Sequence, residues 1–246
     1  MKKLLSFLIC TALILSIIPT AVFAAGETSG QCGDNLTWSY NTATATLTIS
    51  GTGDMFDFYI GAPWTSYRSS IRYIVISDRI TRIGLSAFSE CTDLTNVTIP
   101  NSVASIGESA FYDCSGLTSI TVPDSVTSIG DYAFSNCTGL TSITIPDSVR
   151  SIGDGAFSDC TGLTSITIPD SVTSIGRMAF SSCSGLSSIT VGTKNEKYFS
   201  NGNCLIEKDT DKLILGCKNS VIPHSVTIIG DSAFYGCTGL TGITIP

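Results

Sequence analysis

The sequence has little charge. Aspartate, glutamate, lysine and arginine make up 13% of its 246 residues, and acidic residues outnumber basic ones by 20 to 13. Proteins that bind nucleic acid or anionic membranes present clustered lysine and arginine. The composition therefore argues against a nucleic-acid partner and against an anionic membrane surface.

Histidine is almost missing, and this bears on catalysis. The one histidine lies in the turn Pro223-His224-Ser225, with no base or orienting partner apparent beside it. Aspartates recur at Asp124, Asp147 and Asp170, but each occupies the same turn, so they form a column and not a facing pair of carboxylates. No phosphate-binding glycine loop or metal-ligand spacing is present. We therefore expect a protein without catalytic residues, metal or cofactor.

The first 24 residues have the pattern of a signal peptide. Two lysines precede an apolar run over 4–18, and the segment Val22-Phe23-Ala24 offers small residues for cleavage after its alanine. Polar Thr11 and Ser16 shorten the run that a permanent membrane helix requires. We expect the mature protein to be secreted or held at the cell surface, with no segment inserted in the membrane.

What the sequence has in abundance is repetition. The segment Ser128–Pro146 returns almost unchanged 23 residues later as Ser151–Pro169. Five cysteines share this spacing: Cys91, Cys114, Cys137, Cys160 and Cys183. A period of about 20 to 50 residues is typical of a solenoid, in which each repeat, here called a rung, buries its apolar side chains against its neighbours.

Within one rung, the alternation of side chains predicts which of them face inward. In the strand expected at 119–122, Ile120 and Val122 point to the interior, because successive strand side chains alternate between faces. Asp131 is placed to cap a single helical turn. The repeated cysteines are interpreted as small buried hydrophobes, not as disulfides or zinc ligands. The predicted fold is a right-handed β-rich (α/β) solenoid with 23-residue rungs, short parallel strands and single helical turns.

Residues 25–70 differ from the repeats. Two β-rich runs, Leu36–Tyr40 and Thr44–Ile49, flank a short polar link and predict a hairpin. A solenoid needs a cap over its apolar end. We therefore interpret the segment as an N-terminal β-hairpin cap in which Trp38 and Trp64 cover the first rung. A separate ligand-binding module is the alternative.

The repeats extend over residues 71–246. At their start Arg68 takes the cysteine position, so the first rung is expected to be incomplete. At their end the chain stops at Pro246, after a predicted strand and without the polar cap that solenoids require. We therefore expect a sequence truncated at its C-terminus.

An irregular insertion at 192–220 breaks the repeat. Two β-rich runs flank a polar turn in it and predict a second hairpin. Pairing Lys208 with Leu213 would set Cys204 directly opposite Cys217. This register would allow a disulfide between the two cysteines, and two free thiols are the alternative.

Two candidate binding surfaces follow. Outward hydroxyls on the strand face align in two columns formed by Ser119, Thr121, Ser142, Thr144, Ser165, Thr167, Ser188 and Thr190. The insertion combines charge and aromatic rings at Lys197, Tyr198 and Phe199. For each surface the alternative is a solvated exterior without a partner. Because these columns contain no Trp, Tyr or Arg anchor, we expect weak, multivalent contacts on them.

The repeat also matches a known pattern. Leu-x-x-Ile-x-Ile-Pro followed by Val-x-x-Ile-Gly-x-x-Ala-Phe-x-x-Cys resembles the BspA-like leucine-rich repeat over residues 71–246. The resemblance implies a bacterial-type secreted or cell-surface protein with a role in adhesion. It brings no catalytic residues and names no ligand.

The leading hypothesis is a non-enzymatic extracellular scaffold that binds a protein or a host-cell surface, and we expect a monomer. One alternative is an accessory binding module of a larger secreted enzyme. A more remote alternative is an ice-binding or surface-binding structural protein, since regular columns of serine and threonine on a β-face resemble ice-binding arrays in their spacing.

Overall fold

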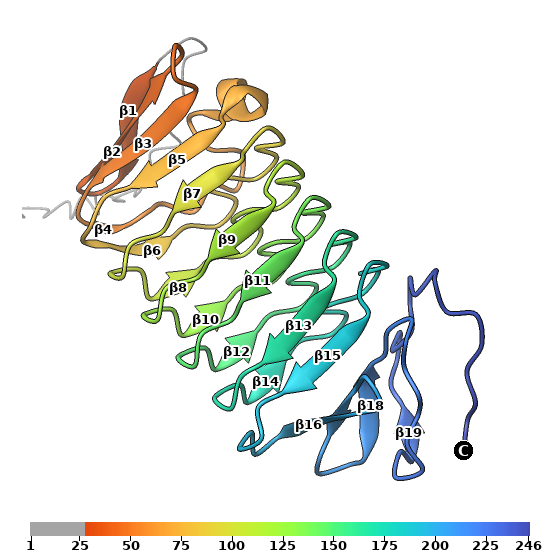
Figure 1. Ribbon diagram of the computed structural model, residues 1–246. Coiled ribbons are helices and arrows are strands. Elements are labelled where there is room, and N and C mark those ends of the chain that lie inside the picture. The colour runs from red at the N-terminus through yellow and green to blue at the C-terminus, as the bar shows by residue number, and fades with distance from the viewer. Residues whose placement is uncertain (1–27) are drawn as a thin grey trace, which may run out of the picture.

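The computed structural model describes residues 28–246, which form a solenoid of stacked rungs (Figure 1). Regular rungs follow one another at a constant interval, and each contributes one strand to each of two rows, as the pairing of Ser119 with Ser142 and of Ser128 with Ser151 shows. The predicted solenoid and its period are confirmed. The predicted signal peptide, residues 1–24, lies outside the described residues.

The N-terminal cap is a small antiparallel sheet that merges with the solenoid. Strands β1 (Ser29–Gly33), β2 (Leu36–Asn41) and β3 (Thr46–Gly51) are joined in order, so the predicted hairpin is confirmed and β1 adds a third strand. Strand β3 then pairs in parallel with β5 (Tyr73–Ile76). The cap therefore continues the first row of strands.

The first row forms one broad face along the solenoid (Figure 1). It continues from β5 through β7 (Asn96–Thr98), β9 (Ser119–Thr121), β11 (Ser142–Thr144), β13 (Ser165–Ile168) and β15 (Ser188–Val191). Paired strands are parallel and in register, with Ile120 beside Ile143 and Ile166 beside Ile189. Equivalent side chains of successive rungs therefore align in straight columns.

The second row consists of shorter parallel strands. It is made of β4 (Gly53–Asp54), β6 (Ile80–Ile83), β8 (Ser105–Ile106), β10 (Ser128–Ile129), β12 (Ser151–Ile152) and β14 (Ser174–Ile175). The isoleucine that ends each of the strands from β6 onward points inward and is buried in most of them. The core lies between the two rows.

The predicted single helical turn is wrong. Tyr132 and Asn136 have φ angles of 53° and 60°, and this left-handed backbone breaks a helix after a few residues. The segment is instead a series of turns whose N–H groups bond to the next rung, with 2.8 Å between Tyr132 N and Asp154 O. Asp131 does not cap its own rung, because its Oδ1 accepts a hydrogen bond from Asp154 N at 2.8 Å.

Helix is scarce in the described part of the chain. The 3₁₀ helix η1 (Thr65–Ser70) is the one helix of residues 28–246, and it precedes the first regular rung. Within the same residues there is no helix with the length and apolarity to span a membrane.

The interior is organised around a column of aromatic rings. Phe111, Phe134 and Phe157 are fully buried and nearly parallel, with ring centroids 5.3 and 5.4 Å apart. At the N-terminal end, Trp64 stacks on Phe88 at 5.8 Å and also contacts Trp38 edge-on at 5.7 Å. The expectation that Trp38 and Trp64 cover the first rung is confirmed.

The repeated cysteines form a second buried column. The Cys137 thiol donates a hydrogen bond to Phe111 O of the preceding rung at 3.1 Å, and Cys160 does the same to Phe134 O. Both thiols are fully buried and free, as expected. The cysteine is therefore a small apolar residue that also satisfies a buried carbonyl of its neighbour.

The insertion changes the architecture at the C-terminal end. Strands β16 (Tyr198–Asn201), β17 (Cys204–Glu207) and β18 (Lys212–Leu215) form an antiparallel sheet, which β19 (Ile228–Ile229) joins in parallel. The predicted hairpin is β17–β18, and β16 is an additional strand. Residues of these strands and of the following turn form a second, smaller core cluster.

Candidate functional site

The strand face presents the predicted hydroxyl columns to solvent. Ser119, Thr121, Ser142 and Thr144 are exposed, and each lies directly beside its counterpart in the next strand. Ser165, Thr167 and Thr190 are also exposed, whereas Ser188 is half-buried. The face is therefore flat, hydroxyl-rich and uncharged along β9–β15.

Two apolar side chains extend these columns toward the N-terminus, and the sequence analysis missed them. Tyr73 and Val75 on β5 pair with Asn96 and Thr98 on β7, so they occupy the same outward positions as the later hydroxyls. They are 47% and 45% exposed. The signal was present in the sequence, because Tyr73 and Asn96 stand at the same position of successive repeats. This sheet face, from β5 to β15, is called the strand face below.

The insertion does not offer the predicted aromatic surface. Tyr198 is buried, and its hydroxyl accepts a hydrogen bond from Ile175 N at 3.2 Å, so this ring closes the interior of the last regular rung. Burial raises the pKa of the Tyr198 phenol. Phe199 is half-buried against the second core cluster. Lys197 is exposed, but it forms an ion pair with Asp209 at 2.6 Å.

The disulfide between Cys204 and Cys217 is not formed, and both residues are buried free thiols. Pairing starts with Glu207 opposite Lys212 and shifts further along the strands, so it never reaches the register that would set the two cysteines face to face. Their thiols contact different carbonyls, with Cys217 Sγ 3.7 Å from Asn203 O. The expected register was wrong because the turn closes with Glu207 opposite Lys212 and not with Lys208 opposite Leu213, and alternation alone does not fix where a turn closes.

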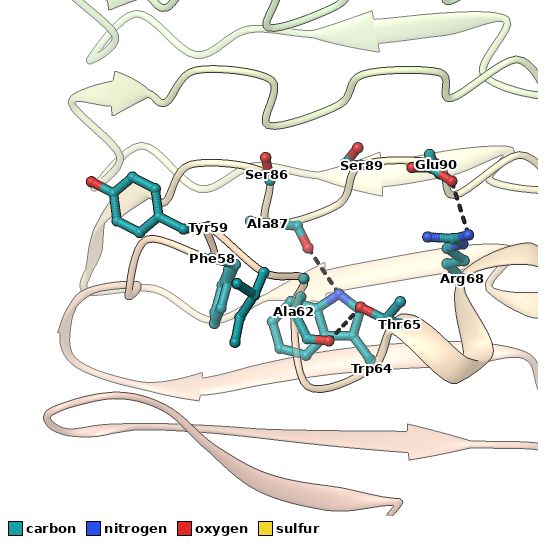
Figure 2. A pocket seen from close by; sticks show the side chains of 12 residues that line it. Phe58, Tyr59, Ala62, Trp64, Thr65, Arg68, Ser86, Ala87, Ser89 and Glu90 are labelled. Carbon is teal, nitrogen blue, oxygen red and sulfur yellow. Dashed lines mark hydrogen bonds and ion pairs between the residues drawn. The ribbon is translucent and has the colours of Figure 1, made fainter. Parts of the chain in front are cut away.

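A pocket of about 380 Å³ lies between the cap and the first rung, and we call it the cap pocket. Figure 2 shows Tyr59 at one end of it and the Arg68–Glu90 ion pair at the other, with Ser86 and Ser89 between them. The guanidinium and the carboxylate are 3.0 Å apart and both are partly exposed. Arg68, which stands at the repeat's cysteine position, lines the pocket and is partly exposed, whereas Cys91 at the same position of the next repeat is buried.

The floor and the loop of the cap pocket are held in place by internal contacts. Trp64 is buried, and its Nε1 donates to Ala87 O at 2.8 Å (Figure 2). Thr65 Oγ1 donates to Ala62 O at 2.5 Å. Gly61 has a φ of 104°, a conformation that a side chain would strain. The pocket is therefore preformed, with a rigid base and an exposed rim.

Several acidic side chains in residues 28–246 accept hydrogen bonds that hold neighbouring rungs together. No group of three or more His, Cys, Asp or Glu side chains in this part of the chain could hold a metal ion. Asp131 and Asp154 each accept a hydrogen bond from a backbone N–H of the next rung. Asp170 likewise accepts a hydrogen bond from Lys194 N at 2.9 Å.

Comparison with solved structures finds bacterial leucine-rich repeat proteins. The chain is similar to one from Eubacterium ventriosum (25% identity, TM-score 0.65), over 88% of this chain and 59% of that one. It is also similar to a leucine rich cell surface protein from Faecalibacterium prausnitzii, with 29% identity and a TM-score of 0.60, over 88% of this chain and 70% of that one. A leucine-rich repeat protein from Bacteroides ovatus has 30% identity and a TM-score of 0.58, over 88% of this chain and 53% of that one. The chain thus spans less than two thirds of the length of the first of these proteins.

The repeats also match a family model. No curated protein matches the chain significantly. The model for the BspA type leucine rich repeat region matches in six copies, over residues 65–187, 106–208 and 213–246. These matches take in all the regular rungs and the cysteine column, and the chain therefore belongs to the BspA-type leucine-rich repeat family.

Proposed function

We propose that the chain is a non-enzymatic extracellular scaffold, secreted or held at the cell surface, that binds a protein on another cell or in the extracellular matrix. The family and the similarity to a leucine rich cell surface protein support this location. The near absence of basic clusters argues against nucleic acid as the partner.

The strand face is the proposed contact surface. The main observation in support is that Tyr73 and Val75 leave apolar surface exposed at its N-terminal end. Tyr73 and Val75 are exposed beside a long row of hydroxyls with no charge among them. Tyrosine is enriched among residues that dominate binding energy, and surrounding polar groups add complementarity. Tyr73 would be the anchor, and the hydroxyls of β7–β15 would supply hydrogen bonds.

The affinity of one such face is expected to be low. The hydroxyl columns contain small side chains that lose little surface on contact, and Tyr73 is the one large aromatic side chain on β5–β15 that faces outward. Display of many copies raises the effective concentration and can increase avidity by about 10²–10⁴. Adhesion through many weak contacts fits this geometry better than a tight one-to-one complex.

The test uses the protein displayed on beads at high density. Beads are added to cultured epithelial cells and to plates coated with extracellular-matrix proteins, and soluble protein is used as the competitor. We expect binding above that of albumin-coated beads, and a loss of most of it for Tyr73→Ala. Tyr112→Ala, which removes a ring of similar exposure outside the strand face, is the matched control. Equal binding by Tyr73→Ala and the unmodified protein would contradict the proposal.

A further inference from the structure

We propose that the cap pocket binds a neutral oligosaccharide, independently of any partner on the strand face. Ligand sites are concave and of about 300–1,000 Å³, with a few convergent polar groups. The cap pocket, at about 380 Å³, lies at the small end of this range. Its rim combines an exposed aromatic ring with donors and acceptors, which is the combination a sugar requires.

The aromatic part of the site is Tyr59. It is 80% exposed, and the adjacent Ile60 is 84% exposed, although both lie on a loop anchored by Trp64 and Gly61. Because the backbone of this loop is already fixed, a ligand that packs on these side chains does not also have to order the loop. A pyranose ring carries C–H groups on one face, and these pack against the electron-rich face of an aromatic ring.

The polar part of the site consists of the Arg68–Glu90 ion pair, at the end of the pocket opposite Tyr59, and of the serine-lined wall between that pair and Tyr59. Arg68 and Glu90 meet through one 3.0 Å contact, which leaves further guanidinium N–H donors and carboxylate lone pairs free. Ser86 and Ser89 line the wall between the two ends of the pocket, and a serine hydroxyl can both donate and accept a hydrogen bond. A sugar hydroxyl both donates and accepts, so adjacent hydroxyls can pair with the guanidinium and the carboxylate together.

The same groups disfavour other small ligands. A phosphate or carboxylate attracted to Arg68 would also be repelled by Glu90, and an amine attracted to Glu90 would be repelled by Arg68, so neither kind of ion gains a net charge attraction from the pair. An apolar ligand would take the ion pair out of water without satisfying its remaining donors and acceptors, which is unfavourable. A neutral molecule with several hydroxyls can contact Tyr59 at one end and hydrogen-bond to Arg68 and Glu90 at the other, and it brings no charge of its own into the pocket.

The proposal is tested by titration calorimetry with four neutral oligosaccharides, namely cellobiose, maltotriose, lactose and N,N′-diacetylchitobiose. We expect at least one of them to bind. Tyr59→Ala should weaken that binding about tenfold through loss of ring contact. Glu90→Gln, which keeps the shape but removes the charge and an acceptor, should also weaken it severalfold.

The control is Tyr73→Ala, which removes an exposed ring on the strand face and should leave sugar affinity unchanged. Thermal melting curves of all variants establish that they are folded. The proposal is overturned if none of the four sugars binds. It is also overturned if binding survives in both Tyr59→Ala and Glu90→Gln, or if inorganic phosphate binds more tightly than every sugar. A failure of cell adhesion by the beads leaves these outcomes unaffected, because they concern a different surface.

Discussion

Phe134 shows how one side chain links three rungs. Its ring lies 5.3 Å from Phe111 and 5.4 Å from Phe157, almost parallel to both, and none of it is exposed. We predict that Phe134→Ala lowers the free energy of unfolding by about 3–5 kcal/mol, because it leaves a cavity that the flanking rings cannot fill. Denaturant titration measures this loss.

Ser142→Ala is the matched control for Phe134→Ala. Its side chain is exposed on the strand face and contributes no packing, so the change should remain within about 0.5 kcal/mol. Similar losses in the two variants would mean that the inside and outside of the rung are wrongly assigned.

The buried thiols make stability depend on pH. Burial raises the pKa of Cys91 and of Cys183 to about 12, whereas an unfolded cysteine ionises near pH ~8.5. Below about pH 8.5 the thiols are protonated in both states, and their contribution to stability is constant. Between there and about pH 12 only the unfolded chain releases these protons, so the free energy of unfolding falls as pH rises.

We therefore predict that the urea midpoint is steady near pH ~7 and declines from about pH 8.5 upward. A Cys91→Ala, Cys183→Ala double variant loses two of the titrating groups, so its midpoint should decline less steeply. Equilibrium unfolding between about pH 7 and about pH 10.5 compares the slopes. Parallel slopes for the two proteins would show that other groups cause the decline.

At the scale of the element, the close approach of successive rungs depends on glycine. A Cβ atom on Gly130 would lie 2.7 Å from Glu108 N and from Gly107 C, both backbone atoms of the preceding rung. We predict that Gly130→Ala destabilises the protein by about 1–3 kcal/mol, because the rungs must move apart. Gly242→Ala, where nothing lies within 4 Å, should have little effect in the same denaturant titration.

The strands could be predicted from the sequence because their signal is repeated. Ile120, Ile143 and Ile166 face inward in successive rungs. The same alternation of inward and outward side chains recurs in each repeat, so each repeat supports the assignment made in the others. The turn that follows Asp131 could not be predicted in the same way. Its N–H groups bond across to the next rung, as Tyr132 N does to Asp154 O, and a local capping pattern carries no information about a partner in another repeat.

The candidate sites were predicted less well than the fold. The hydroxyl columns were found because they follow the repeat, but Tyr198 was misassigned because a bulky tyrosine in an irregular segment has no repeat to indicate its burial. The cap pocket brings Tyr59 together with Glu90, from the loop before the first rung and from the rung itself. No period relates these residues, so only the folded chain shows them as neighbours.

At the scale of the whole molecule, stability is expected to vary along the solenoid. The aromatic column runs without a break from Trp64 to Phe180 and ends there. Beyond it, β19 contributes a two-residue pair, and Ile228 and Ile229 are 49% and 42% exposed. Regions with few buried contacts open at low free energy.

We predict that amide hydrogens exchange most slowly in residues 94–191 and most rapidly in residues 221–246. Hydrogen–deuterium exchange with mass spectrometry measures both regions in one digest. Equal protection of the two regions would show that the solenoid unfolds as a single cooperative unit in spite of the break in its core.

The constant register between rungs bears on how the number of repeats can change. Ser128 pairs with Ser105 on one side and with Ser151 on the other, through the same contacts each time. Because each rung touches only its immediate neighbours, a gene that gains or loses the codons of one whole repeat leaves every remaining junction intact. The reach of the molecule can thus be lengthened or shortened in steps of about 4.8 Å, without redesign of a single side chain.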